Sequence, residues 1–207
     1  MKMLMLNDLR QVPLAERFLL HAHANLDAAI RLTDALRHSE DEQSFANGAV
    51  TLSLAFHSVE LFLKGAILSA EPGVNFKSEG HNISQLERRY RKLFPAKTFR
   101  FEMPFRSEVA ELVEPDLELQ RQLVEQLNEL QKKVPQDQFL RYPANNQGEE
   151  WETVEQMAMG YSAPLFAATL NRLRDDFLRL TAIWASNSAA SAKAGTTSPS
   201  APSHSTV

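Results

Sequence analysis

The chain has no cysteine, only seven glycines in 207 residues, and no apolar run of membrane-spanning length that is free of charged residues. Without cysteine it can form no disulfide, no thiolate nucleophile and no zinc site with sulfur ligands. Lys64 interrupts the strongest apolar run well short of the roughly 18 residues that a span requires. A glycine-rich phosphate loop and a Gly-x-Ser-x-Gly turn are also absent. We therefore expect a cytoplasmic protein with no membrane contact and no cofactor.

Six histidines remain as candidates for metal binding or acid–base chemistry. No two of them have the i, i+4 spacing with which a pair of helical histidines binds zinc. His21 and His23 would lie about 200° apart around a helix, so they cannot share a metal ion. We predict no metal site.

The composition, 43% apolar and 23% charged, is typical of a helical globular protein. Apolar side chains recur at helical spacing in four main segments. These predicted helices cover residues 13–37, 42–70, 82–94 and 162–186. Ser39 with Glu42 fits a capping box that would begin the second helix, and Asn82 with Gln85 fits a cap for the third.

The predicted fold is all-α, an up-and-down four-helix bundle with a helical insertion near residues 107–133. Residues 1–186 would form this single helical domain. Residues 187–207 are rich in serine, alanine and proline, and they have too few large apolar side chains to offset the entropy lost on ordering. We expect them to form a disordered C-terminal tail.

The predicted helix over residues 42–70 is apolar nearly all the way round, apart from one narrow polar stripe. The stripe consists of Ser53, His57, Glu60 and Lys64. Steps of four, three and four residues keep these side chains on one face. A helix this apolar must lie inside a bundle, so the stripe faces a slot that opens to solvent or meets a partner. Glu60 is spaced to pair with Lys64 one turn later.

Charge is distributed unevenly along a chain whose net charge is −4. Residues 81–106 carry seven basic residues against two acidic ones, with aromatic residues between them, and residues 108–125 are mainly acidic. The basic residues are Arg88, Arg89, Arg91, Lys92, Lys97, Arg100 and Arg106. Two interpretations remain open. Either the basic residues grip phosphates while the aromatic rings stack on bases, or the rings fill the core while the charged segments face each other or solvent.

Three segments resemble motifs of the HEPN family of helical bundles, which is found in prokaryotic defence and toxin–antitoxin systems. They are residues 55–65 (AFHSVELFLKG), 80–86 (GHNISQL) and 141–143 (RYP). The resemblance covers the layout of residues 14–186. It implies a HEPN-like four-helix bundle that forms a homodimer.

Ribonuclease members of this family use an arginine and a histidine, separated by four to six residues, on the last core helix. The last predicted helix of this chain has arginines but no histidine. Arg17 with His23 and Arg31 with His38 have the spacing, but both pairs lie on the first helix. The resemblance therefore implies a non-catalytic module. A metal-independent endoribonuclease that uses these four residues is the alternative.

Family members without this motif are associated with nucleotide binding or with a partner such as a minimal nucleotidyltransferase. By this resemblance we expect the chain to bind a nucleotide, RNA or a protein partner. The candidate ligand-binding residues are His57, Glu60, Lys64, His81, Arg141 and Tyr142. Lys64 and Arg141 would donate to phosphate. In the competing interpretation Glu60 and Lys64 form a structural pair, and Arg141 anchors a long loop.

Overall fold

The structure is a computed structural model of residues 1–207. It describes residues 9–39, 44–102 and 163–194, together with the isolated positions 118, 121, 122, 125 and 147. Four α-helices and one 3₁₀ turn organise these residues: α2 (Leu14–Arg37), α3 (Phe45–Ala70), α4 (Ile83–Leu93), η2 (Lys97–Phe99) and α8 (Ala163–Ala194). No strand occurs in this part of the chain, which confirms the all-α prediction for it.

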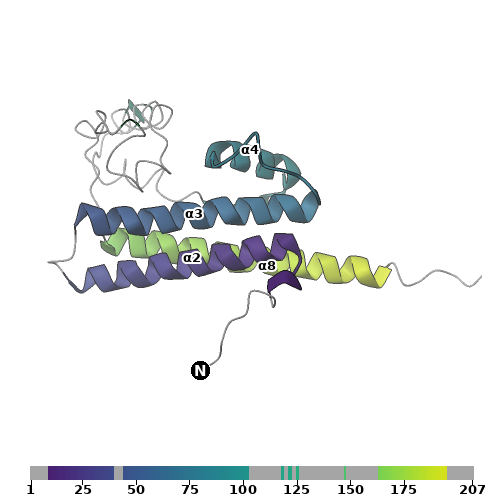
Figure 1. Cartoon of the computed structure of the whole chain (residues 1–207), viewed down its shortest axis with the longest axis horizontal. Helices are drawn as coiled ribbons and strands as arrows, with labels where there is room; N and C mark the ends of the chain where they lie inside the picture. Colours follow the sequence, from purple (N-terminus) through teal and green to yellow (C-terminus); the bar gives the residue numbers. More distant parts are fainter. Residues whose placement is uncertain are drawn as a thin grey trace, which may run out of the picture.

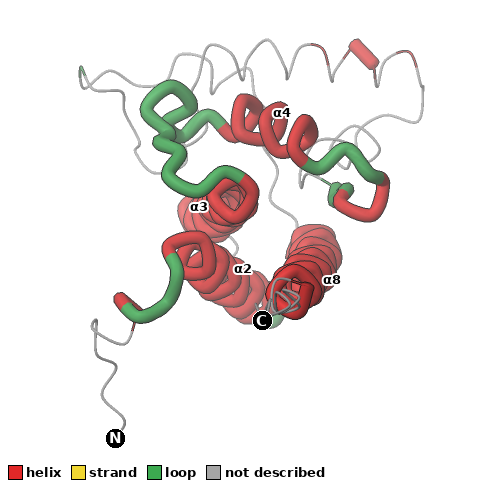
Figure 2. The backbone as a smooth tube through the Cα atoms, turned by 90° about the vertical axis from the view of Figure 1, so that its right-hand side faces the viewer, coloured by secondary structure: helices red, strands yellow, loops and turns green. Residues whose placement is uncertain are grey.

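The three long helices α2, α3 and α8 lie side by side, and α2 and α3 run in opposite directions (Figure 1). The shorter α4 lies against the side of α3 that faces away from α2 (Figure 2). The most extensive helix contact joins α2 to α3. Gly65 allows this close approach, because a Cβ atom there would lie 2.9 Å from the Leu19 side chain and 3.0 Å from the Ala15 carbonyl oxygen.

The core between α3 and α8 is aromatic. The rings of Phe62 and Phe177 stack with their centroids 3.7 Å apart, and Phe101 meets both rings edge-on. Arg179 of α8 attaches the segment that carries Phe101, since its guanidinium donates to the carbonyl oxygens of Thr98 and Arg100 at 2.5 and 2.8 Å. A segment far from α8 in sequence is thereby held against the bundle.

The predicted bounds of α2 and α4 agree with the structure to within one residue. The Asn82 cap is confirmed, because its Oδ1 accepts the Gln85 N–H at 3.0 Å. The capping box at Ser39 is wrong. α3 begins at Phe45, where the Ser44 hydroxyl oxygen accepts the Asn47 N–H at 3.3 Å. A serine nearer the apolar run caps this helix instead.

α8 continues to Ala194, past the predicted helix end at residue 186. The helix therefore extends eight residues beyond its predicted end. Alanine is the best helix former, so the alanine-rich sequence there extends an existing helix at little cost. The predicted helical insertion near residues 107–133 and the remainder of the tail, 195–207, lie outside the described residues apart from isolated positions.

α3 is long and apolar enough to cross a membrane by length and composition alone. In its most apolar window, however, 67% of the residues are buried within the structure. Helices of this kind also form the cores of globular bundles. Its burial against α2, α4 and α8 accounts for its composition.

Candidate functional site

Three side chains converge on the carboxylate of Glu60, which is 3% exposed. Lys64 donates from Nζ to Oε1 at 2.6 Å, and Nδ1 of His81 lies 3.0 Å from the same oxygen. Nδ1 of His57 lies 3.5 Å from Oε2, within ion-pair range but without a hydrogen bond. We call His57, Glu60, Lys64 and His81 the Glu60 cluster. The structure brings these four predicted residues together, whereas Arg141 and Tyr142 lie outside the described residues.

The Glu60 carboxylate is ionised despite its burial. Burial alone would raise the pKa of this carboxyl group, but the contacts with His57, Lys64 and His81 lower it to about 2. Lys64 is itself 9% exposed, and its ammonium group also lies 5.5 Å from the centre of the Phe76 ring. The charge of Lys64 is therefore neutralised inside the protein. This geometry supports the structural pair rather than a phosphate donor at Lys64.

The Glu60 cluster holds the loop between α3 and α4 against the bundle. His81 belongs to this loop, and Phe76 from the same loop packs between Lys64 and Phe18 of α2. Arg89 of α4 also binds this loop, with hydrogen bonds of 2.6 Å to Glu71 and to Glu79. The cluster thus sets the position of α4 on α3.

Arg17, His23 and Arg31 of the ribonuclease alternative lie on α2, and His38 caps its C-terminus. No described contact joins either arginine to its histidine. His23 packs against α8, with Nε2 3.3 Å from Oγ1 of Thr181 and its ring edge-on to Phe177. Burial lowers the pKa of His23. Arg31 and His38 are exposed near the other end of α2. His23 is therefore a packing residue in this chain.

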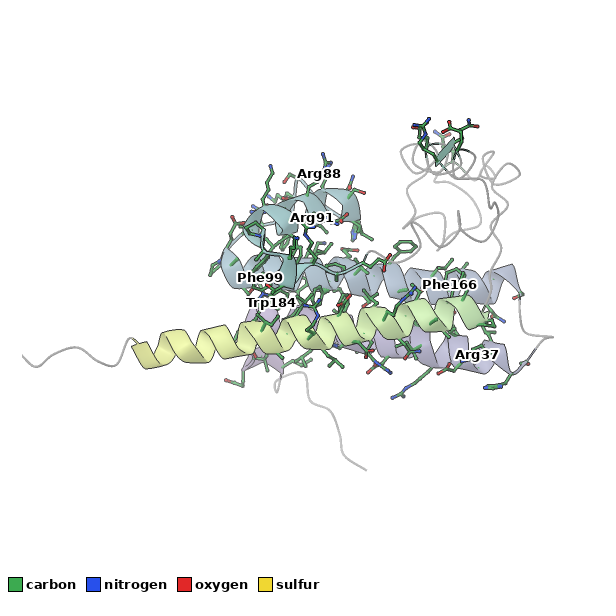
Figure 3. The ribbon with its side chains drawn as sticks, turned by 180° about the vertical axis from the view of Figure 1, so that it is seen from behind. Arg37, Arg88, Arg91, Phe99, Phe166 and Trp184 are labelled. Atoms are coloured by element: carbon green, nitrogen blue, oxygen red, sulfur yellow. The ribbon has the colours of Figure 1, made fainter. Side chains whose placement is uncertain are left out.

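The described basic residues of the stretch 81–106 are one arginine with two carboxylate partners and five exposed cations. Arg89 is held by Glu71 and Glu79, and Arg106 lies outside the described residues. Five exposed cations remain on α4 and the turn after it, and we call them the basic strip: Arg88, Arg91, Lys92, Lys97 and Arg100. Figure 3 shows Arg88 on the side of α4 that faces away from the bundle.

The aromatic residues that the structure describes in this stretch pack inward. Tyr90 and Phe101 are 2% and 9% exposed, and Phe94 and Phe99 pack against the core. The Tyr90 hydroxyl donates to the Phe99 carbonyl oxygen at 2.6 Å, and burial raises the pKa of Tyr90. The interpretation in which the rings fill the core is supported, so these rings are not available as stacking platforms for bases.

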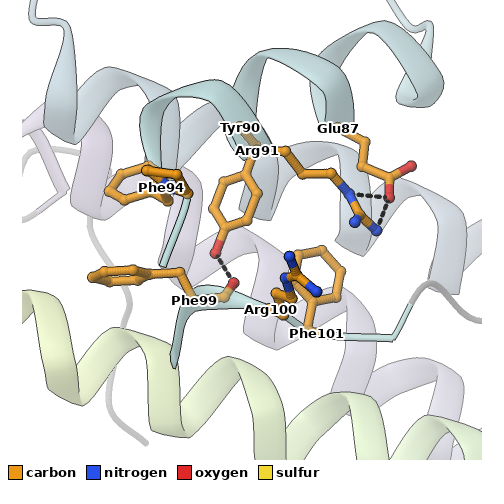
Figure 4. Close-up of a pocket in the computed structure, with 8 residues that line it drawn as sticks. Glu87, Tyr90, Arg91, Phe94, Phe99, Arg100 and Phe101 are labelled. Carbon is orange, nitrogen blue, oxygen red and sulfur yellow. Dashed lines mark hydrogen bonds and ion pairs between the residues drawn. The ribbon is translucent and has the colours of Figure 1, made fainter. Parts of the chain in front are cut away.

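A small pocket lies between α4 and residues 97–101, and the sequence gives no sign of it (Figure 4). Its volume is about 60 Å³. It is lined by Glu87, Tyr90, Arg91, Phe94, Pro95, Phe99, Arg100 and Phe101. Arg91 donates from Nε and NH2 to one oxygen of the buried Glu87, at 2.9 and 2.7 Å. Two guanidinium groups therefore border a pocket with aromatic walls.

The described residues contain no group of three or more histidine, aspartate or glutamate side chains placed to hold a metal ion. They offer instead a buried Glu60–Lys64 pair, which the exposed His81 and the partly exposed His57 flank, and a row of exposed cations on α4 and the turn after it. Comparisons with family models, with curated proteins and with solved structures give no match for this chain.

Proposed function

We propose that this chain is a non-catalytic, HEPN-like four-helix-bundle module that binds single-stranded RNA through the basic strip. One observation carries the proposal: the five cations of the strip are exposed, and in the part of the chain that the structure describes Arg91 alone among them pairs with an acidic side chain. Lys64 and Arg89, by contrast, are both paired with carboxylates. Exposed cations grouped on one surface element attract polyanions even when the net charge of the protein is negative.

The arrangement of the strip supports contact with a phosphate backbone. Arg88 and Lys92 are one helical turn apart and so lie on the same face of α4. Lys97 and Arg100 follow on the adjacent turn. Among the described residues no acidic side chain pairs with Lys92, Lys97 or Arg100. Because the strip has few acidic competitors, a strand would gain phosphate contacts without first breaking ion pairs, except at Arg91.

The test is fluorescence anisotropy with a labelled single-stranded RNA at two salt concentrations. We expect binding that weakens with salt, and that weakens further in the double variant Arg88→Gln/Lys92→Gln. The matched control is Arg31→Gln/Arg37→Gln, which removes the same charge from exposed positions on α2. Equal loss of affinity in both variants would show a general charge effect and would contradict the assignment to α4.

The resemblance to the HEPN family adds that the module forms a homodimer and that a nucleotide or a nucleotidyltransferase is an alternative partner. Light scattering of the purified chain measures the first point directly. If neither RNA nor a nucleotide binds in a salt-sensitive way, a protein partner is the remaining alternative.

Incubation of the purified chain with mixed RNA in EDTA tests for ribonuclease activity. The variants His23→Ala and His38→Ala are assayed beside the parent.

A further inference from the structure

We propose that the pocket between α4 and residues 97–101 receives a terminal phosphate group of the RNA strand that lies on the basic strip. This inference rests on the proposed function and adds a preference for strands with a phosphorylated end. The pocket borders the strip, because Arg91 and Arg100 belong to both.

The size of the pocket limits what can enter. Its volume of about 60 Å³ leaves room for several water molecules. A whole nucleotide is too large for this space, but one compact anionic group fits. An internal phosphodiester continues into sugar on both sides, so it stays on the open surface. A terminal phosphate is joined to sugar on one side only, so its free oxygens can enter the pocket.

The buried carboxylate of Glu87 holds Arg91 in place. Both hydrogen bonds from Arg91 reach the same oxygen of Glu87, through Nε and NH2. A guanidinium group has five N–H donors, so donors on NH1 and NH2 are left for a ligand. Because Glu87 fixes the side chain beforehand, a ligand orders Arg91 at a reduced entropy cost.

Arg100 supplies the second guanidinium group. No acidic side chain pairs with it in the part of the chain that the structure describes, and its own carbonyl oxygen is fixed by Arg179. Figure 4 shows Arg91 and Arg100 drawn at the same pocket, with Glu87 beyond Arg91. Two arginines against one carboxylate leave one net positive charge, which favours a terminal phosphate because it carries more negative charge than a phosphodiester.

The experiment compares three forms of one labelled RNA by fluorescence anisotropy: a 5′-phosphorylated strand, a 3′-phosphorylated strand, and a strand one nucleotide longer with hydroxyl ends. The longer strand has the same number of phosphates, so a difference reports their position. We expect one phosphorylated strand to bind about tenfold more tightly, the scale of a charge-assisted hydrogen bond. Which end is preferred identifies the polarity of the strand on the strip.

Variants locate the preference in the pocket. Arg100→Gln, at an exposed position, should bring the ratio of affinities close to one, and Arg100→Lys should restore only part of it because lysine lacks the planar fork. Arg88→Gln is the matched control: it should weaken all three strands by the same factor and preserve the ratio. Circular dichroism checks that each variant is folded.

Two results would overturn the pocket assignment while leaving the proposed function intact: equal binding of all three strands, or a preference that survives Arg100→Gln. Failure of every strand to bind would overturn the proposed function and this inference together. The outcomes are therefore distinguishable in one set of titrations.

Discussion

The Glu60 cluster and the basic strip both contain cations, but they differ in what surrounds those cations. Lys64 is 9% exposed and bonded to a carboxylate that is 3% exposed. The cations of the strip are exposed, and Arg91 alone among them is bonded to a buried acid. Burial with a partner makes a charge part of the fold, whereas exposure without one leaves it available to a ligand.

The largest expected effect tests the buried side of this comparison. Lys64→Met leaves the Glu60 carboxylate buried without its closest partner, and we expect it to lower the free energy of unfolding by about 3 kcal/mol or more. Urea denaturation measures this change. The double variant Glu60→Leu/Lys64→Met should recover much of the loss, because no isolated charge remains. A Lys64→Met protein as stable as the parent would contradict the assignment.

The dependence of stability on pH follows from the lowered pKa of Glu60. Its folded pKa of about 2 lies below the ordinary value of 4.5 for a glutamate, so the stabilisation is fully present above pH 4.5 and is lost as the pH falls toward 2. Its upper limit is about 3 kcal/mol, from the conversion of pKa units to free energy. We expect the parent and Glu60→Gln to differ in stability at pH 6 and to converge near pH 2. If the difference in unfolding free energy between the two proteins stays constant from pH 6 to pH 2, protonation of Glu60 is not the cause of the acid dependence.

A smaller effect is expected where the bundle meets the strip. Arg179→Gln removes the hydrogen bonds to the carbonyl oxygens of Thr98 and Arg100. Because Arg179 is 41% exposed, we expect a loss of only about 1 kcal/mol. RNA affinity should fall as well, since the turn that carries Lys97 and Arg100 would lose its attachment to α8. Thermal unfolding and anisotropy together measure the two effects, and unchanged values in both would show that the turn is held by its aromatic contacts alone.

The smallest effect on stability belongs to the strip itself. Arg88→Gln/Lys92→Gln should change the free energy of unfolding by less than about 0.5 kcal/mol, because both positions are exposed. The same variant should reduce the slope of log affinity against log salt by about 1.4, if each cation neutralises one phosphate of a single strand. A large loss of stability with an unchanged salt slope would contradict this prediction, because it would show that Arg88 and Lys92 support the fold and do not contact phosphate.

The helices and the Glu60–Lys64 pair could be predicted from the sequence because they depend on neighbours within one or two turns. The spacing of Glu60 and Lys64 is local, and so are the Asn82 cap and the apolar period of α2. The start of α3 was predicted wrongly, since two serines can each act as a cap and their sequence neighbours do not distinguish them. α8 extends past its predicted end because alanine continues a helix at little cost even where large apolar side chains are few.

The role of each charge depended on contacts between distant residues. Ring packing drew Phe101 into the core, and Arg179, far along the chain, fixed the adjacent backbone. This placement left Arg100 at the edge of a pocket that no sequence pattern indicates. The sequence by itself determined the helices, their amphipathic faces and the i, i+4 ion pair, because these follow from backbone periodicity. Only the tertiary structure decided which cations are neutralised and which face solvent, because burial and partner distance are set by segments that meet only in the folded chain.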